Sequence, residues 1–300
     1  MELRHVAGKT WVIEATDALL CLYRLNERDA VLMDTGIARA DREGLTELLE
    51  RTGIIPRGII CTHAHYDHTG NAAFLREKFD GKIAAQLIEA GIGATPESYR
   101  ANYAPLTYGQ CRIYLREPAF PTDVLIGIQD DRLSFCGTEF GVMQLPGHSA
   151  GQIGVITPDN VAYLADSLMG PALMASAKLP TSMNVALDMD TKRSLLDLDC
   201  DAYVVAHRDV LCDIRDLVAQ NLAFYTAKLH DLLACLRDGM TTSEWLMAFG
   251  TWAGFRTHSA YKLCVIRRNF DNFAAYLEDS GQVSIQRDAT EKRYYHAAGN

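Results

Sequence analysis

The sequence lacks both a paired-cysteine motif and a long apolar run. Its eight cysteines are scattered without a single Cys-x-x-Cys pair, so neither a cysteine-rich zinc site nor a disulfide framework is predicted. No stretch approaches the roughly 18 uninterrupted apolar residues of a membrane helix, and residues 1–5 are not followed by the apolar core of a signal peptide. We therefore expect a cytoplasmic protein with no membrane partner.

Positive charge is also in short supply. The chain carries 29 Lys and Arg against 38 Asp and Glu, a formal net charge of −9, which argues against broad, sequence-independent binding to nucleic acid or to anionic membranes. Histidine is scarce as well, with nine residues in a chain of 300. A cluster of histidines in such a chain is therefore informative.

Three histidines and one aspartate fall within six positions. His63, His65, Asp67 and His68 come directly after Gly58-Ile59-Ile60, an apolar run that predicts a short buried strand leading into a loop. Because a strand sends alternate side chains to opposite faces, we expect the first two histidines to point the same way. The turn after them would bring Asp67 and His68 toward a second position, so two adjacent metals could be bound. The alternative is a histidine-rich surface loop without a metal.

The His-x-His-x-Asp-His spacing of these residues resembles the signature of the metallo-β-lactamase fold superfamily. Members of that superfamily have further metal ligands downstream, and this chain has a suitable residue at each position, in the same order. They are His148 in a Pro-Gly-His-Ser turn, Asp166 at the end of a short apolar run, and His207 at the end of another. The resemblance implies one metal held by His63, His65 and His148, a second held by Asp67, His68 and His207, and Asp166 between them.

Two other positions bear on this resemblance. Asp34 begins an Asp-Thr-Gly turn that the superfamily also has, and the resemblance implies that this turn supports the site. The superfamily usually has glycine after the last histidine ligand, whereas here Arg208 follows His207. Arg208 either leans toward the site, where it could bind an anionic substrate group or lower the occupancy of the second metal, or faces solvent at the start of a helix.

The resemblance also implies a reaction. Two metals that share a water would acidify it toward hydroxide near neutral pH, so a dinuclear metal-bound hydroxide would hydrolyse the substrate. Asp67 is the candidate catalytic residue, because its carboxylate could orient the hydroxide or carry a proton. Zinc is the default for two divalent transition-metal ions in a histidine-rich site, although carboxylates at both metals also suit iron or manganese.

Short segments indicate the substrate class. Residues 165–169, Ala-Asp-Ser-Leu-Met, resemble the Gly-Asp-Thr-Leu-Phe segment of glyoxalase II thioesterases, which favours a small-molecule ester or thioester. Lactonases of the superfamily often have tyrosine where this chain has Met169, and flavodiiron oxidoreductases have glutamate where it has His65, so both are disfavoured. The alternatives are a phosphodiesterase or ribonuclease, and a metal-binding sensor or interaction protein that acts through its C-terminal domain.

Short apolar segments alternate with segments of helical spacing, which predicts an α/β fold. Together with the resemblance, this alternation implies an αββα metallo-β-lactamase sandwich as a catalytic domain over residues 1–209. Residues 95–122 predict a partly helical insertion whose aromatic side chains pack against the domain or line an apolar substrate pocket. The other predicted elements are a three-stranded meander over 10–33, helices over 40–52 and 70–79, and hairpins over 132–143 and 153–164.

Residues 210–300 predict a C-terminal domain of a different kind. Leucines recur on one helical face over 210–238, two further helices follow, and 281–296 predict a β-hairpin, so the domain is helical and winged-helix-like. Winged helices often bind DNA, but this domain has ten Lys and Arg against ten Asp and Glu, so we do not expect nucleic acid as a partner. We expect a lid, a homodimer surface or a stabilising appendage.

Overall fold

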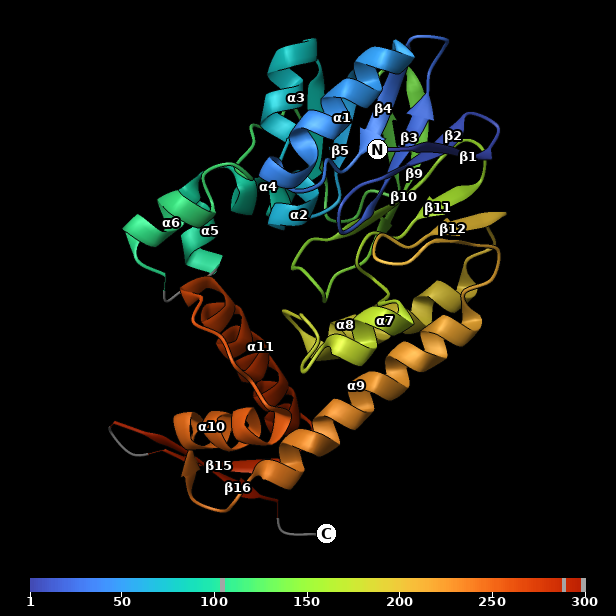
Figure 1. Ribbon diagram of the computed structural model, residues 1–300. Coiled ribbons are helices and arrows are strands. Elements are labelled where there is room, and N and C mark those ends of the chain that lie inside the picture. Colours follow the sequence, from blue (N-terminus) through green and yellow to red (C-terminus); the bar gives the residue numbers. More distant parts are fainter. Residues whose placement is uncertain (103–105, 288–289, 298–300) are drawn as a thin grey trace.

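The computed structural model describes residues 1–102, 106–287 and 290–297. Two β-sheets pack face to face, helices cover the outer face of each sheet, and a C-terminal helical region extends to one side (Figure 1). The predicted αββα sandwich with a helical C-terminal region is confirmed. In the described part of the chain, no helix combines the length and the apolar character needed to cross a membrane.

The first sheet has seven strands in chain order. They are β1 (Leu3–Ala7), β2 (Thr10–Glu14), β3 (Leu19–Arg24), β4 (Asp29–Met33), β5 (Ile55–Cys61), β6 (Lys82–Gln86) and β7 (Val124–Ile126). The first four strands are antiparallel neighbours. They form the predicted meander with one additional strand, β1, before it. The last four are parallel, because longer crossover segments connect them.

The second sheet has six strands. In spatial order they are β13 (Val210–Leu211), β12 (Ala202–Val204), β11 (Val161–Tyr163), β10 (Ile153–Ile156), β9 (Thr138–Gln144) and β8 (Arg132–Phe135). Both predicted hairpins are confirmed, since β8 pairs with β9 and β10 with β11, each antiparallel. The helix expected from residue 210 is wrong at its start, because Val210 and Leu211 pair with β12 and the helix begins only at Arg215.

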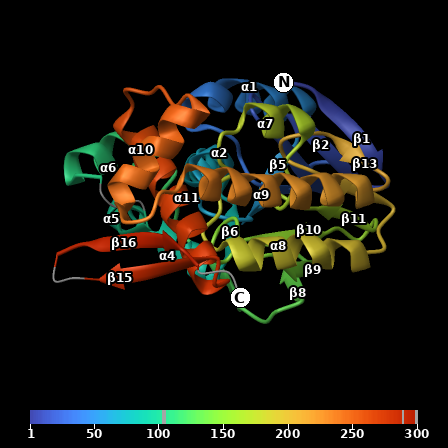
Figure 2. The same ribbon diagram turned by 90° about the horizontal axis from the view of Figure 1, so that it is seen from below.

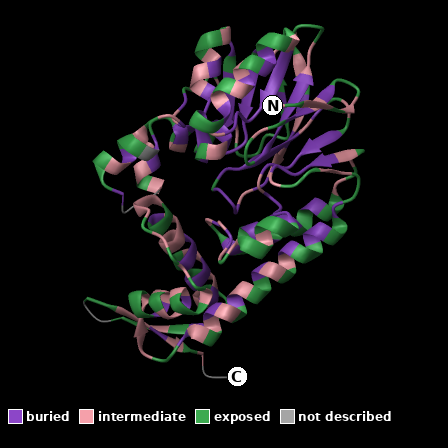
Figure 3. Cartoon of the chain, in the orientation of Figure 1, coloured by how far each residue is buried: buried purple, intermediate pink, exposed green. Residues whose placement is uncertain are grey.

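One hydrophobic core lies between the two sheets (Figure 3). In β5, residues 58–61 are all buried, because this parallel strand is covered on both faces. Ile60 of β5 faces the second sheet and shares its core with Tyr163 of β11. The end of the strand that precedes the metal motif is thus fixed from both sides.

Helices on the outer face of the first sheet complete one layer. They are α1 (Ala38–Thr52), α2 (Tyr66–Thr69), α3 (Ala72–Phe79) and α4 (Leu87–Gly93). In α1, Leu45, Leu48 and Leu49 recur on one helical face, and all three are buried in the core outside the sheet.

The second predicted helix begins at Ala72, two residues later than expected. The backbone N–H of Gly70 donates to the carbonyl of Gly36, and that of Asn71 donates to the hydroxyl of Thr35, so neither joins the ladder of the helix. These two hydrogen bonds connect the segment after the metal motif to the Asp-Thr-Gly turn.

The insertion over residues 95–122 packs within the domain. It forms α5 (Pro96–Asn102) and α6 (Tyr108–Tyr114). Tyr99 and Phe120 are buried in the core outside the first sheet, and the hydroxyl of Tyr99 donates to the carbonyl of Pro118. For these two aromatic residues, packing is the role that the structure shows.

Helices over the second sheet connect the sandwich with the C-terminal region. They are α7 (Pro171–Ser176), α8 (Val185–Ser194), the 3₁₀ helix η1 (Leu195–Asp197) and α9 (Arg215–Cys235). The first half of α9 packs Leu217 and Val218 against the outside of the sheet, and the second half packs Leu229 and Leu232 into the C-terminal core. One helix therefore belongs to both cores, and the domain division at residue 209 stays a prediction.

The C-terminal region completes its own core with two more helices and a small sheet. These are α10 (Thr242–Ala253), α11 (Ala260–Asp279), β14 (Met240–Thr241), β15 (Val283–Arg287) and β16 (Lys292–His296). Trp245 is buried in this core, and its indole donates to the carbonyl of Leu232. α11 then returns to the sandwich, where Cys264 lies in the same core as Cys111 of α6 (Figure 1, Figure 2). The region thus contacts the sandwich through α9 and again through α11.

Candidate metal centre

Four of the seven candidate ligands follow β5 directly. The strand ends at Cys61, His63 and His65 lie in the loop after it, and Asp67 and His68 lie in α2. Strand alternation therefore does not set the direction of the first two histidines, contrary to our expectation. The loop brings them together instead, with ring centroids 4.6 Å apart and planes at 79°.

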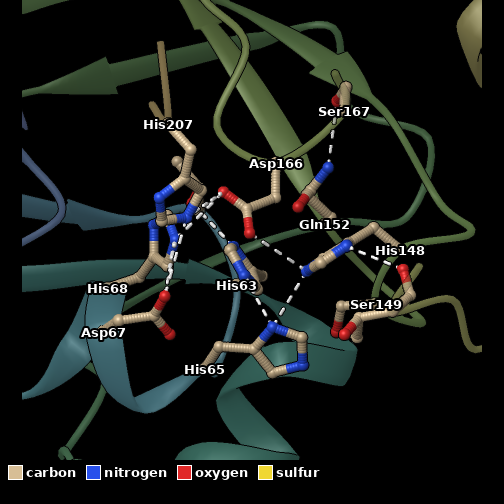
Figure 4. A network of polar contacts seen from close by, with 12 residues as sticks. His63, His65, Asp67, His68, His148, Ser149, Gln152, Asp166, Ser167 and His207 are labelled. Atoms are coloured by element: carbon tan, nitrogen blue, oxygen red, sulfur yellow. Dashed lines mark hydrogen bonds and ion pairs between the residues drawn. The ribbon is translucent and has the colours of Figure 1, made fainter. Parts of the chain in front are cut away.

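His63 and His65 meet His148 and Asp166 in one group of donor atoms (Figure 4). Nδ1 of His65 lies 3.0 Å from Nε2 of His63 and 2.9 Å from Nε2 of His148. Nε2 of His148 lies 3.3 Å from Oδ2 of Asp166. Three buried ring nitrogens and one carboxylate oxygen thus converge on one small volume.

A second group of donor atoms contains Asp67, His68, Asp166 and His207. Oδ1 of Asp166 lies 3.1 Å from Nε2 of His68 and 3.2 Å from Nε2 of His207. Oδ2 of Asp67 lies 3.6 Å from Nε2 of His207. Asp166 belongs to both groups, so the structure brings all seven candidate ligands together around one carboxylate (Figure 4).

These donor atoms fit divalent transition-metal ions. Within each group they lie within 4.8 Å of one another, a spacing compatible with zinc–ligand bonds of about 2.0–2.2 Å. Oδ1 of Asp166 and Nε2 of His68 are buried and, among the described residues, have no partner in hydrogen-bonding geometry, although they lie 3.1 Å apart. Buried polar atoms without such a partner are expected where an ion binds.

Asp34 orients one of the candidate ligands from behind. Nδ1 of His68 lies 2.8 Å from Oδ2 of Asp34, so this nitrogen donates to the carboxylate and leaves Nε2 for a metal. Asp34 is itself buried and accepts hydrogen bonds from the backbone and hydroxyl of Thr62 and from the hydroxyl of Tyr163. Through Asp34, the Asp-Thr-Gly turn therefore supports His68, as the resemblance implied.

Backbone carbonyls orient two more histidines. Nδ1 of His148 donates to the carbonyl of Thr181 at 3.1 Å, and Nδ1 of His207 donates to the carbonyl of Asp17 at 2.6 Å. Both rings are left with Nε2 directed into the cluster.

Burial favours the neutral form of the histidines in the first donor group. It lowers the pKa of His63, His65 and His148 below the usual range of histidine. The neutral imidazole is the form that binds a metal, so no proton has to leave these rings.

The second group holds protons that a metal would displace. The carboxylate of Asp166 raises the pKa of His207 to about 9. Burial opposes protonation of His68, but Asp166 and Asp34 outweigh it and raise its pKa well above the usual range. Burial alone would raise the pKa of Asp166, yet the surrounding imidazoles hold it well below its usual range. Ion binding at this group is therefore coupled to proton release.

Comparison with known proteins agrees with this geometry. The family model of the Metallo-beta-lactamase superfamily matches residues 19–207, more than half of the chain. The chain belongs to the metallo-β-lactamase superfamily. The hydroxyacylglutathione hydrolase GloC of Haemophilus influenzae is 25% identical over 183 residues, covering 60% of this chain and 80% of that protein. A hydroxyacylglutathione hydrolase of Albidiferax ferrireducens is 30% identical over 215 residues, covering 69% of this chain and 71% of that protein.

Solved structures of similar fold extend the match to the C-terminal region. A beta-lactamase domain protein from Burkholderia ambifaria has a TM-score of 0.74 at 18% identity, covering 99% of this chain and 94% of that chain. A metallo-beta-lactamase family protein from Thermus thermophilus has a TM-score of 0.71 at 20% identity, covering 93% of each chain. At these identities the likeness concerns the fold alone, and it includes the C-terminal helices.

In this metallo-β-lactamase domain, a buried glutamate that the sequence did not single out joins two ligand loops. Oε2 of Glu89, in α4, accepts the backbone N–H of Ala64, which lies between two histidine ligands. Oε1 accepts the hydroxyl of Ser149 at 2.5 Å and the backbone N–H of Gly151 at 2.6 Å, just after the third histidine. Burial raises the pKa of Glu89, and the three donors act against that shift by stabilising the carboxylate.

The C-terminal region reaches the loop that holds the third histidine. The side-chain amide of Asn269, in α11, donates to the hydroxyl of Thr181, and that of Asn272 donates to the carbonyl of Ser182. The carbonyl of Thr181 in turn accepts the Nδ1–H of His148. A chain of hydrogen bonds thus runs from α11 to a candidate ligand.

Gly147 directly precedes His148, packs against α8 and has a backbone conformation that favours glycine. Its φ is +130°, and a Cβ there would lie 2.2 Å from Cα of Asp188. Replacing Gly147 by Ala should lower the free energy of unfolding by about 3 kcal/mol or more, from backbone strain and a clash that no side chain can relieve. It should also weaken metal binding, because His148 follows directly. Denaturant unfolding and metal titration measure the two effects.

Gly137 provides a matched control for this substitution. Its φ is +77°, but a Cβ there would meet no atom within 4 Å. Gly137→Ala should cost only the backbone strain, about 1 kcal/mol, and leave metal binding unchanged. Equal losses of stability in the two variants would show that the contact with Asp188 does not matter.

A cavity of about 860 Å³ opens onto both donor groups. Side chains from α2, α7, α9 and α11 contribute to its walls. Arg208 does not line it: its side chain is exposed in the turn after β12, and the helix expected there begins at Arg215. None of the described residues of the insertion over 95–122 lines it either. The space beside the candidate metal centre has the size of a small-molecule site.

Proposed function

We propose that this chain is a metal-dependent hydrolase of a small-molecule ester or thioester. The observation that carries the proposal is the pair of donor groups that share Asp166 and open onto a cavity. Membership of the superfamily and the names of the hydroxyacylglutathione hydrolases support a hydrolase, and those names favour a thioester. Zinc is the first candidate because imidazoles dominate the donors, and iron or manganese also suits the carboxylates.

Each donor group would hold one ion. When bound, the two ions would supply Lewis acidity for the substrate oxygen and lower the pKa of water. The first ion would be held by His63, His65 and His148, the second by Asp67, His68 and His207, and Asp166 would contribute to both sites.

Asp67 is the carboxylate that can take part in proton transfer. It lines the cavity, and its side chain keeps some exposure to solvent. In this position it can orient the attacking water, take its proton and pass it to the leaving group. The water oxygen bonds to the acyl carbon as the acyl–sulfur or acyl–oxygen bond breaks, and the products are a carboxylic acid and a thiol or alcohol.

Three basic residues of the C-terminal region argue against a nuclease. Arg267 pairs with Asp271, and Arg287 and Lys292 both pair with Glu278. Carboxylates beside these cations reduce the attraction for phosphates along a nucleic acid. Salt-sensitive binding of RNA or DNA that weakens in an Arg267→Ala/Arg268→Ala double variant would reverse this argument.

Metal analysis and a substrate panel test the proposal together. Protein purified without chelator and reconstituted with zinc, iron or manganese should reach two ions per chain, one for each donor group. It should hydrolyse esters or thioesters faster than lactones, phosphodiesters or RNA, and a chelator should abolish the activity. A content that never exceeds one ion would contradict the dinuclear assignment. Full occupancy without turnover on the panel would favour the sensor instead.

A further inference from the structure

The cavity beside the candidate metal centre has two apolar walls. One wall belongs to the segment that includes α7, with Leu168, Met169 and Leu173. A second wall belongs to α11, with Val265 and Ile266. An apolar group of a ligand that lies between these walls leaves water, which favours its binding.

α11 also brings positive charge into this cavity. Arg268 is half-buried and lines the same cavity as the candidate ligands His65 and His148. Lys262 lines the cavity from an exposed position six residues earlier, about 9 Å away along the helix. In the described lining, Asp17 is the one acidic residue outside the candidate ligands. The cavity therefore combines apolar walls with a cation close to the metal centre.

We propose that the substrate of this hydrolase is an apolar acyl ester or thioester with one anionic group, a carboxylate or a phosphate, that Arg268 binds. This inference rests on the proposed hydrolase function and narrows it. Glutathione thioesters, by contrast, carry two carboxylates and one ammonium, and the residues that could face the two further charges, Lys262 and Asp17, lie at exposed positions of the lining, whereas Arg268 is half-buried. The expected substrate therefore differs from the one in the names of the relatives.

The neighbour of Arg268 gives a matched control. Arg267 occupies the next position on α11, is also half-buried, and does not line the cavity. Its guanidinium pairs with Asp271 at 3.0 Å. Arg268→Gln and Arg267→Gln remove the same charge from adjacent positions, so a difference between them reports on the cavity and not on the net charge of the helix.

Matched thioesters test the proposal on the metal-loaded enzyme. The probes are the S-butanoyl thioesters of 3-mercaptopropionate, of its neutral carboxamide, of 2-mercaptoethyl phosphate and of glutathione. The KM of an anionic probe should lie below the KM of the carboxamide. Arg268→Gln should raise the KM of the anionic probe, divided by the KM of the carboxamide, about 10- to 100-fold, as expected for the loss of a charge-assisted hydrogen bond. Arg267→Gln should leave this ratio within about twofold, and the response of the phosphate probe shows which anion is preferred.

Some outcomes of these assays would overturn the proposal. They are equal effects of the two arginine variants, an equal rise in KM for neutral and anionic probes, and a preference for the glutathione thioester over every other probe. A binding measurement separates this failure from that of the hydrolase function. S-butyl-3-mercaptopropionate is a thioether that cannot be hydrolysed, and calorimetry should show that it binds more weakly to Arg268→Gln than to Arg267→Gln. That result would stand even if no thioester were turned over, whereas equal binding would refute the anion site.

Discussion

Asp166→Ala is expected to lose at least one metal ion and nearly all hydrolytic activity. Asp166 is the residue common to both donor groups, with Oδ1 3.1 Å from Nε2 of His68 and Oδ2 3.3 Å from Nε2 of His148. Lewis-acid stabilisation by a metal contributes several kcal/mol, so its loss should lower kcat/KM by roughly a thousandfold or more. Elemental analysis and kcat/KM on the best substrate of the panel measure the two effects.

Two further variants make this result specific. Asp166→Asn keeps the volume of the side chain but removes its charge, so it should lose metal as well. His230→Ala changes an exposed histidine of α9 that belongs to neither group and should keep both metal and activity. Two tightly bound ions and normal turnover in Asp166→Ala would rule out a shared ligand at this position.

Glu89→Ala is expected to weaken metal binding about 10- to 100-fold, the effect typical of losing a group that orients ligands. It should also lower the free energy of unfolding by about 3 kcal/mol or more, because three donors lose their buried partner. Those donors are the N–H groups of Ala64 and Gly151 and the hydroxyl of Ser149. Titration against a competing chelator and denaturant unfolding of the metal-free protein measure the two losses.

Conservative variants distinguish the carboxylate from its volume. Glu89→Gln keeps the shape but turns an amide NH₂ toward groups that also donate, so it should still weaken metal binding. Ser149→Ala removes only one of the three donors and should cost about 1 kcal/mol of stability. If Glu89→Gln bound metal as tightly as the unaltered protein, the two ligand loops would not depend on this carboxylate.

The candidate ligands could be located from the sequence to different degrees. His63, His65, Asp67 and His68 form a local cluster whose chemistry is evident from composition alone. His148 and the two later ligands are single residues after ordinary apolar strands, and only their order in the superfamily marked them. The structure then brings all of them within reach of one carboxylate.

The groups that hold these ligands in place could not be located in this way. Glu89 is an acidic residue in the first turn of a helix, which is an ordinary position for it. Asn272 is a polar residue within a long helix, and its partner Ser182 lies 90 positions away. Neither residue has a local pattern, because the contact that gives it a role forms only when distant segments pack.

Errors at element boundaries have a related cause, which is hydrogen bonding to residues outside the expected helix. The helix expected from residue 210 starts later because Val210 pairs with Val204 in β12. The helix expected from Gly70 starts later because its N–H bonds to the carbonyl of Gly36. In both cases a hydrogen bond to a strand or turn outside the helix overrides a local helical pattern.

α9 leaves the sandwich beside the second sheet, and α11 comes back to it at α6, so the C-terminal region is anchored at two points. A region with two such contacts cannot rotate about a single hinge. Moving it away from the sandwich would remove Cys264 from the core that it shares with Cys111. The short helix α7, by contrast, has no buried residue, yet it carries Leu173 into the cavity wall. Displacing α7 would therefore disturb less buried packing than opening the C-terminal region at α9 or α11.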